Sequence, residues 1–304
     1  MPILNVRHVT TYRYRRPVGF GEHRFMFRPR DSVDQRLIES HLDITPEPRY
    51  LRWLLDPHGN NVGVATFDTR ATELCFDSRL RVEHTPDPTP LDSRIAPHAQ
   101  TLPFTYSAAE APDLLRSAER HFPDPGRAVD DWARSFFRSG AATRTADLLA
   151  DMVRAVRRRF TYIARFEPGL QDPATTLRLG TGTCRDFAVL VMEALRSLGL
   201  ATRFVTGYLH AGEGDPRGTE MRGGGNTHAW LQVFLPDAGW IELDPTNDIV
   251  GSRDLVRIAT TRDPEHAIPL GGTWLGFPAD CLGMEVSVRV TTEDIGPRLH
   301  ARHA

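Results

Sequence analysis

Gly180-Thr-Gly-Thr-Cys184-Arg-Asp-Phe-Ala188 is the stretch that decides the fold of this 304-residue chain. It places a cysteine where a glycine-rich turn meets the start of an apolar helix. The buried stripe of that helix consists of Phe187, Leu190, Val191, Ala194, Leu195 and Leu198, and Gly199 is typical of the residue after a helix. We therefore expect a helix from about Thr183 to Leu198. The unpaired N–H groups and the dipole at its start favour a thiolate at Cys184.

Two later strands supply the partners that a cysteine nucleophile requires. The first runs from Thr227 to Leu235 and alternates so that His228 and Trp230 share a face. The second, Trp240-Ile-Glu-Leu-Asp244, ends at Pro245. His228 and Asp244 share a face if the loop between the strands has three or five residues, whereas a four-residue loop separates them. On that condition we expect Cys184 as nucleophile, His228 as base and Asp244 as the group that orients the base.

The chain divides by composition into three parts. Residues 1–83 contain short strands and turn signals without helical periodicity, which predicts a β-sandwich. Residues 84–104 are rich in proline and predict a linker. Residues 105–304 predict the catalytic domain, with helices from Ala111, over Ala128–Arg138 and over Ala146–Arg159 before the cysteine. The glycine-rich loop Ala211–Asn226 is placed to close over the site.

Composition excludes several classes of protein. A net charge of −2 argues against a dedicated nucleic-acid or membrane surface, and the N-terminus lacks a leader pattern, so we expect a cytoplasmic protein. All 37 basic residues are arginine. Cys75, Cys184 and Cys281 are too few and too irregularly spaced for a disulfide framework or a zinc site. We therefore expect no cofactor and no metal.

The catalytic segments resemble the transglutaminase-like superfamily. Residues 143–247 resemble its core, with Cys184, His228 and Asp244 on the family's Cys-His-Asp positions. Residues 1–83 resemble the β-rich domain that precedes the core in a bacterial subgroup, through the stretches Thr11-Tyr-Arg-Tyr14, Pro17-Val18 and Asp56-Pro-His-Gly-Asn60. The resemblance implies an α+β fold in which a β-sandwich precedes a papain-like core of a helix bundle and an antiparallel sheet. It also implies acyl transfer from an amide without an obligatory cofactor.

Five further residues are candidates for binding the substrate or the oxyanion. Tyr162 is the alternative to a tryptophan that eukaryotic transglutaminases carry upstream of the cysteine. Thr183 and Trp230 neighbour the catalytic cysteine and histidine. Arg185 and Asp186 follow the nucleophile directly, and a local structural pairing is the alternative role for both.

Three functions remain open at this stage. In the first, the thioester on Cys184 is hydrolysed by water, so that the protein is a cysteine peptidase or amidase acting on a peptide or protein amide. In the second, an amine resolves the thioester, as in a protein-glutamine transglutaminase. In the third, the core is a catalytically silent binding module. The intact triad favours an enzyme, and the bacterial domain arrangement favours hydrolysis.

Overall fold

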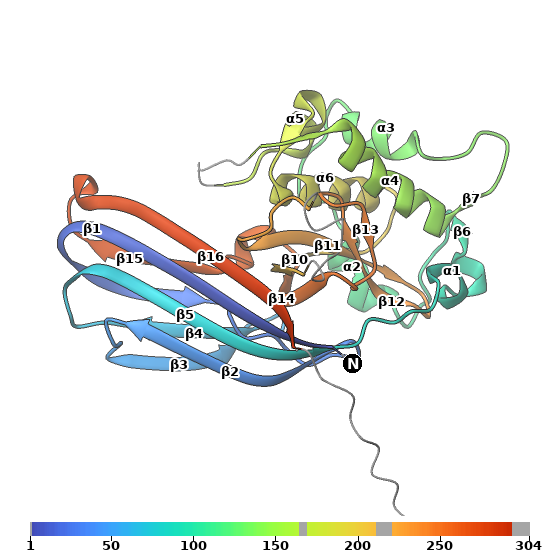
Figure 1. Cartoon of the computed structure of the whole chain (residues 1–304). Coiled ribbons are helices and arrows are strands. Elements are labelled where there is room, and N and C mark those ends of the chain that lie inside the picture. Colours follow the sequence, from blue (N-terminus) through green and yellow to red (C-terminus); the bar gives the residue numbers. More distant parts are fainter. Residues whose placement is uncertain (1, 164–168, 211–220, 294–304) are drawn as a thin grey trace, which may run out of the picture.

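The computed structural model describes residues 2–163, 169–210 and 221–293 as a strand-rich unit beside a mixed unit of helices and sheet (Figure 1). The strand-rich unit, here called the sandwich, contains β1 (Ile3–Phe25), β2 (Gln35–Thr45), β3 (Tyr50–Leu55), β4 (Asn61–Thr66), β5 (Ala71–His84), β15 (Leu270–Leu275) and β16 (Cys281–Glu293). Buried and more exposed side chains alternate along these strands, as expected for a sheet with one face in the interior. In β5, for example, Leu80 and Val82 are buried between more exposed neighbours. The predicted α+β fold with a β-rich N-terminal part is confirmed.

Strand β1 holds the sandwich together because it takes part in both layers. Its first half pairs with β5 and β16, and its second half pairs with β4 and β15, all antiparallel. Phe25, Phe27 and Phe76 meet in the hydrophobic interior between the two layers of the sandwich. The predicted turn between β3 and β4 is present, and Gly59 supplies its positive φ of 77°.

The two C-terminal strands correct the predicted domain limits. We expected residues 105–304 to form the catalytic domain, but β15 and β16 return to the sandwich, where Ile3 of β1 pairs with Glu293. We propose that the sandwich comprises residues 3–84 together with 270–293. The predicted linker 84–104 also differs from expectation. It contains α1 (Leu91–Arg94) and the single turn η1 (Pro97–Ala99), and Ile95 and Ala99 are buried against the helices.

The mixed unit, here called the core, is an antiparallel sheet packed against helices. Its sheet has the order β13 (Ile249–Val250), β12 (Gly239–Asp244), β11 (His228–Leu235), β10 (Thr202–Leu209) and β14 (Leu255–Thr261). Its helices are α2 (Ala111–Ala118), α3 (Ala128–Arg134), α4 (Thr145–Arg159), α5 (Pro173–Leu179) and α6 (Cys184–Ser197). Short elements join them: β6 (Thr101–Leu102), β7 (Thr143–Arg144), β8 (Thr161–Tyr162), β9 (Thr181–Gly182) and η3 (Pro264–His266), while η4 (Pro278–Asp280) lies between β15 and β16 of the sandwich.

Helix α6 lies at the centre of the core. The predicted stripe is buried, because Phe187, Leu190 and Leu195 pack in one cluster with Leu231 of β11 and Leu243 of β12. Among the described residues, no helix is long and apolar enough to cross a membrane.

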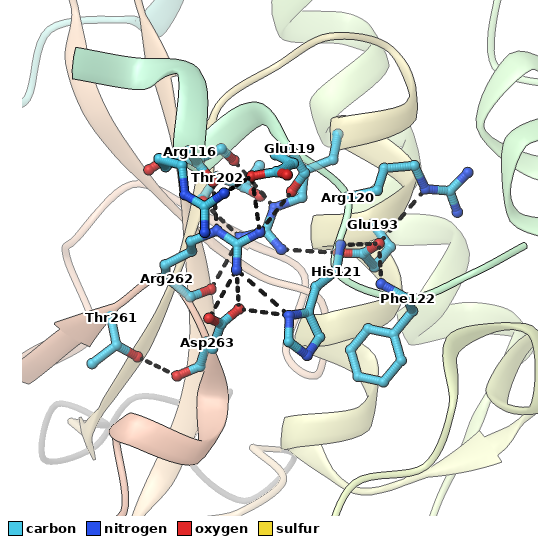
Figure 2. A network of polar contacts seen from close by, with 12 residues as sticks. Arg116, Glu119, Arg120, His121, Phe122, Glu193, Thr202, Thr261, Arg262 and Asp263 are labelled. Atoms are coloured by element: carbon cyan, nitrogen blue, oxygen red, sulfur yellow. Dashed lines mark hydrogen bonds and ion pairs between the residues drawn. The ribbon is translucent and has the colours of Figure 1, made fainter. Parts of the chain in front are cut away.

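A buried ion pair anchors the C-terminal half of α6, and Figure 2 shows its acid, Glu193, beside His121 and Phe122. The Glu193 carboxylate accepts the backbone N–H groups of His121 and Phe122 and binds Arg196 at 2.9 Å, with both side chains 1% exposed. Arg196 in turn donates to the carbonyls of Thr202 and Arg262. The pair therefore ties the segment after α2 and one end of the β10–β14 pair, where β10 begins and β14 ends, to one helix.

The sandwich and the core meet through apolar and polar contacts. Tyr208 and Val256 of the core sheet are buried in a cluster with sandwich residues of β1 and β5. Gln35 exchanges two hydrogen bonds with the backbone of Arg257, at 2.8 and 3.0 Å. The Val288 N–H of β16 donates to the carbonyl of Gly225, three residues before His228. The sandwich thus contacts the segment that leads into the candidate site.

Candidate active site

A capping box builds the start of α6. Thr183 is the N-cap residue, and its backbone N–H and hydroxyl both donate to Asp186 Oδ2 at 2.9 Å, while its Oγ1 accepts the Asp186 N–H. Asp186 is fully buried and also accepts the Gln171 N–H. These bonds give Thr183 and Asp186 a local structural role, and contact of either residue with substrate stays a prediction.

Cys184 occupies the first position of α6 and is 8% exposed. No acceptor among the described residues takes up its backbone N–H, as expected for the first turn of a helix. A Cβ at Gly182 would meet Asp186 and Phe187 at 3.0 and 3.1 Å, so the chain enters the helix closely packed. The two glycines thus serve different needs, because Gly182 is required by packing and Gly180 takes a positive φ of 63°.

The register of β11 and β12 meets the condition set by the sequence. Leu231 pairs with Leu243, and Leu235 pairs with Gly239, so the loop has three residues. Asp237 and Gly239 take the positive φ values, 64° and 73°, that such a tight connection requires. His228 and Asp244 therefore lie on one face of the sheet.

His228 and Asp244 form a fully buried pair. His228 Nε2 and Asp244 Oδ2 are 2.8 Å apart, and neither side chain is exposed. His228 Nδ1, the other ring nitrogen, has no hydrogen-bond partner among the described residues. The geometry leaves Nδ1 for the nucleophile, since Nε2 is fixed by the carboxylate.

The charges around His228 favour its protonated form. Burial lowers the pKa of the imidazole, but the Asp244 carboxylate and then Cys184 outweigh burial and raise that pKa to about 10. The charge of Cys184 is thus one of those that act on the imidazole.

Asn247 is a supporting residue that the sequence analysis missed. Its Nδ2 donates to Asp244 Oδ2 at 2.8 Å, and the Thr246 N–H donates to Asp244 Oδ1 at 2.9 Å. Asn247 also exchanges bonds with the backbone of Arg222, at 2.7 and 3.1 Å. The only signal in the sequence was the position of an asparagine three residues after the aspartate, in a turn that follows a strand.

Gly223 lies directly against the His228 ring. Its φ is 85°, and a Cβ there would stand 2.8 Å from His228 Nδ1. A larger residue would displace the ring or the segment. Gly223 belongs to the predicted glycine-rich loop Ala211–Asn226, of which residues 211–220 lie outside the described residues, so the loop's role as a lid stays a prediction.

Tyr162 lies near the thiol, as the sequence analysis proposed. It is held by β8, whose pairing with β9 places Tyr162 opposite Gly182, two residues before Cys184. Burial and then the charge of Cys184 raise the pKa of the Tyr162 hydroxyl to about 12. Tyr162 is therefore a neutral hydrogen-bond donor at neutral pH.

Trp230 and Arg185 differ from each other in their surroundings. Trp230 is fully buried, its ring lies 5.9 Å from that of His228, and its indole N–H donates to Glu242. Its indole N–H is therefore already engaged, and a role of Trp230 in substrate binding stays a prediction. Arg185 is exposed and makes no ion pair among the described residues, so it stays a candidate for substrate contact.

Comparison with known proteins agrees with this geometry. Residues 4–83 match the family described as the bacterial transglutaminase-like N-terminal region, and residues 130–245 match the one described as the transglutaminase-like superfamily. An uncharacterised protein of Mycobacterium tuberculosis is 29% identical over 97% of this chain and 94% of its own length. A protein-glutamine gamma-glutamyltransferase of Pseudomonas aeruginosa is 25% identical over 71% of this chain, which matches 31% of that protein.

One solved structure supports the fold along almost the whole chain. A protein of Cytophaga hutchinsonii, described as a candidate cysteine protease, superposes with a TM-score of 0.71 at 18% identity. The match covers 97% of this chain and 93% of that one. It includes the sandwich as well as the core.

Proposed function

We propose that this chain, which belongs to the transglutaminase-like superfamily, is a cysteine peptidase or amidase that hydrolyses peptide or isopeptide bonds. The observation that supports the proposal is the fully buried His228–Asp244 pair at 2.8 Å, with the second imidazole nitrogen left open beside Cys184. A buried histidine that served packing alone would need no carboxylate beside it, because burial favours the neutral ring.

The proposed reaction proceeds through a thioester. The Cys184 sulfur attacks the amide carbonyl carbon, and His228 gives its proton to the departing amine as the C–N bond breaks. Water then attacks the thioester while His228 accepts one of the water protons. The carboxylic acid leaves, and the sulfur recovers its charge. Asp244 holds the ring in place and stabilises the imidazolium throughout.

Two donors are available for the negative oxygen that forms during each attack. The Cys184 backbone N–H points out of the first turn of α6, and the Tyr162 hydroxyl lies near the thiol. Removing one oxyanion donor in other enzymes costs about 10²–10³ in rate. We expect Tyr162→Phe to lower kcat by at least about tenfold with little change in the alkylation of Cys184. An unchanged kcat would remove Tyr162 from this role.

Transfer to an amine is the second candidate function. The similarity to the gamma-glutamyltransferase of P. aeruginosa supports it, although this chain matches less than a third of that protein. The two functions differ only in which nucleophile reaches the thioester. If the protein does transfer acyl groups, its amine acceptors must come from elsewhere, because none of its side chains is a lysine.

The deciding experiment supplies a glutamine-containing peptide library with and without millimolar primary amine. We expect hydrolysed products in both cases by mass spectrometry, with chelator without effect. Predominant amine incorporation would instead establish the transferase. Cys184→Ala and the matched control Cys75→Ala separate catalysis from a silent binding module. If iodoacetamide labels Cys75 or Cys281 in preference to Cys184 at neutral pH, the proposal fails. The predicted cytoplasmic location stays a prediction.

A further inference from the structure

A small pocket lies where the sandwich meets the core sheet, away from the candidate active site. Its volume is about 150 Å³. The sandwich contributes Arg30, Asp31, Ser32 and Asn60, and the core contributes Arg203 of β10 and Arg257, Ile258, Ala259 and Thr260 of β14. Three guanidinium groups therefore border a space that holds on the order of five water molecules at ~30 Å³ each.

Arg203 has no carboxylate partner in this pocket. Its Nε donates to the neutral amide of Gln232, and its guanidinium lies 4.2 Å from the centre of the Trp240 ring. No acceptor among the described residues binds its two Nη groups. Burial, together with the charges of Arg257 and Arg30, lowers the pKa of Arg203 to about 10 even though Glu242 acts the other way. The positive charge of Arg203 is thus incompletely balanced.

The acidic residues nearby are already engaged. Glu242 accepts bonds from Trp230, Gln232 and Arg257. Asp34 binds Arg257 at 2.9 Å and the Ser32 hydroxyl at 2.7 Å. Asp31, which lines the pocket, accepts the Leu37 N–H at 2.7 Å. None of these carboxylates is bound to Arg203.

Arg30 faces the pocket from the sandwich and is held by the backbone. Its Nη1 donates to the His58 carbonyl at 3.2 Å, and a Cβ at Gly59 would stand only 2.4 Å from that nitrogen. Because Gly59 has no side chain, the Arg30 guanidinium has room to lie beside it. Arg30 is otherwise exposed and makes no ion pair with an acid within residues 2–163, 169–210 and 221–293, so the sandwich keeps a cation at this seam.

The wall formed by β14 is irregular at the pocket. Thr206 pairs with Ala259 and Gly207 pairs with Arg257, which leaves Ile258 as the extra residue of a β-bulge. Asn60 fixes the next part of this wall, because its amide bonds both the N–H and the carbonyl of Thr260, at 2.9 and 2.8 Å. Bulges redirect side chains and are frequent beside functional sites. Here the bulge lies beside Arg257 and Thr260.

We propose that this pocket binds a compact tetrahedral oxyanion of the class of inorganic phosphate. Guanidinium groups bind phosphate oxygens through paired N–H donors, and the free Nη groups of Arg203 supply such a pair. Arg30 and Arg203 belong to different units, so a bound anion bridges the sandwich and the core. Binding to the folded state alone then stabilises the whole protein.

The test is direct binding of inorganic phosphate to the full chain, followed by calorimetry and by the midpoint of thermal unfolding. We expect saturable binding and a rising Tm with phosphate, and neither with chloride at matched ionic strength. Acetate, which carries a single carboxylate, is the comparison ligand and should bind at least tenfold more weakly than phosphate. Equal binding of acetate would make this a carboxylate site and overturn the tetrahedral assignment, and absence of saturable phosphate binding would overturn the proposal as a whole.

Two variants locate the anion. Arg203→Gln and the exposed Arg30→Gln should each weaken phosphate binding by about tenfold or more, and Arg30→Gln keeps the test valid if the buried variant fails to fold. Arg289→Gln, on the outer face of the sandwich, is the matched control and should leave binding unchanged. Equal losses in all three variants would show a diffuse charge effect and reject the pocket. Since the readout is binding, failure here is distinct from failure of the proposed catalysis.

Discussion

Glu242 and Asp244 stand two residues apart on β12, share one face of the sheet and are 3% and 0% exposed, yet their partners differ completely. Asp244 binds an imidazole, a group that can take up and release a proton. Glu242 binds a guanidinium, an indole and an amide, which keep their protons. Burial is therefore nearly equal on the two residues, and we propose that the partner decides which carboxylate serves chemistry and which serves the join between the units.

The largest expected effect comes from Asp244→Asn. The amide cannot stabilise an imidazolium and favours the wrong tautomer of His228, so we expect amide cleavage to fall by about 10³–10⁴. The measurement is kcat/KM on a peptide substrate identified in the library, with circular dichroism as the check on folding. A loss below tenfold would make the two carboxylates of β12 equivalent and contradict the comparison.

The next effect is a dependence of stability on pH to which the His228–Asp244 pair contributes. The folded-state pKa of His228 is raised above its unfolded value of about 6.5, so the pair stabilises fully below that value and is lost as the pH rises toward about 10. We expect the stability difference between the wild type and Asp244→Asn to shrink by at least ~2 kcal/mol from pH 6.5 to 10. Urea unfolding at several pH values measures it, and a difference independent of pH would refute the raised pKa.

Glu242→Gln should lower the stability of the protein more than its activity, in contrast to Asp244→Asn. The variant leaves the Arg257 charge with Asp34 alone, so we expect a loss of about 2 kcal/mol in the free energy of unfolding. Catalysis should fall less than tenfold, because His228 keeps Asp244. Urea unfolding and kcat/KM on the same preparation test both statements. If activity falls as far as in Asp244→Asn, the division of roles on β12 is wrong.

The smallest effect is expected from Asn247→Ala. Asp244 Oδ2 then keeps His228 but loses one of its two side-chain donors, so we expect roughly a tenfold loss in kcat, equivalent to ~1.4 kcal/mol. Asn61→Ala in the sandwich is the matched control and should leave kcat unchanged. An equal loss in both variants would assign the effect to general destabilisation.

Local patterns in the sequence predicted the centre of the site. The stripe of α6 depends on neighbours within a few residues, so the helix could be derived and is confirmed. The shared face of His228 and Asp244 was predicted only on the condition of a three- or five-residue loop, and the observed register meets that condition. The role of Asn247 could not, because it depends on how the turn after Pro245 folds back onto Arg222. The Trp230 N–H can be buried because it donates to Glu242 on the neighbouring strand of the hairpin. Trp230 and Glu242 are both even-numbered, so the same register that brings His228 and Asp244 together also allowed this contact.

The return of β15 and β16 shows where sequence patterns fail. Val286-Ser-Val-Arg-Val290 alternates as a strand should, but alternation does not say which strand is the partner. Its partner β1 is the most distant strand in the chain, and β16 is largely exposed, so burial gives little guidance either. Helix α5 was also missed, although Asp172 before Pro173 is a typical start signal.

The pairing of Ile3 with Glu293 also determines when β1 can complete its hydrogen bonding during synthesis of the chain. A ribosome adds roughly 5–20 residues per second, so β1 waits on the order of tens of seconds for β16 to be made. During that interval one edge of a 23-residue strand has open hydrogen-bonding groups, the kind of edge at which chains aggregate. Synthesis is therefore the stage at which this protein most needs protection, and slower translation of the segment before Cys281 should lengthen the exposure and lower the yield of folded protein.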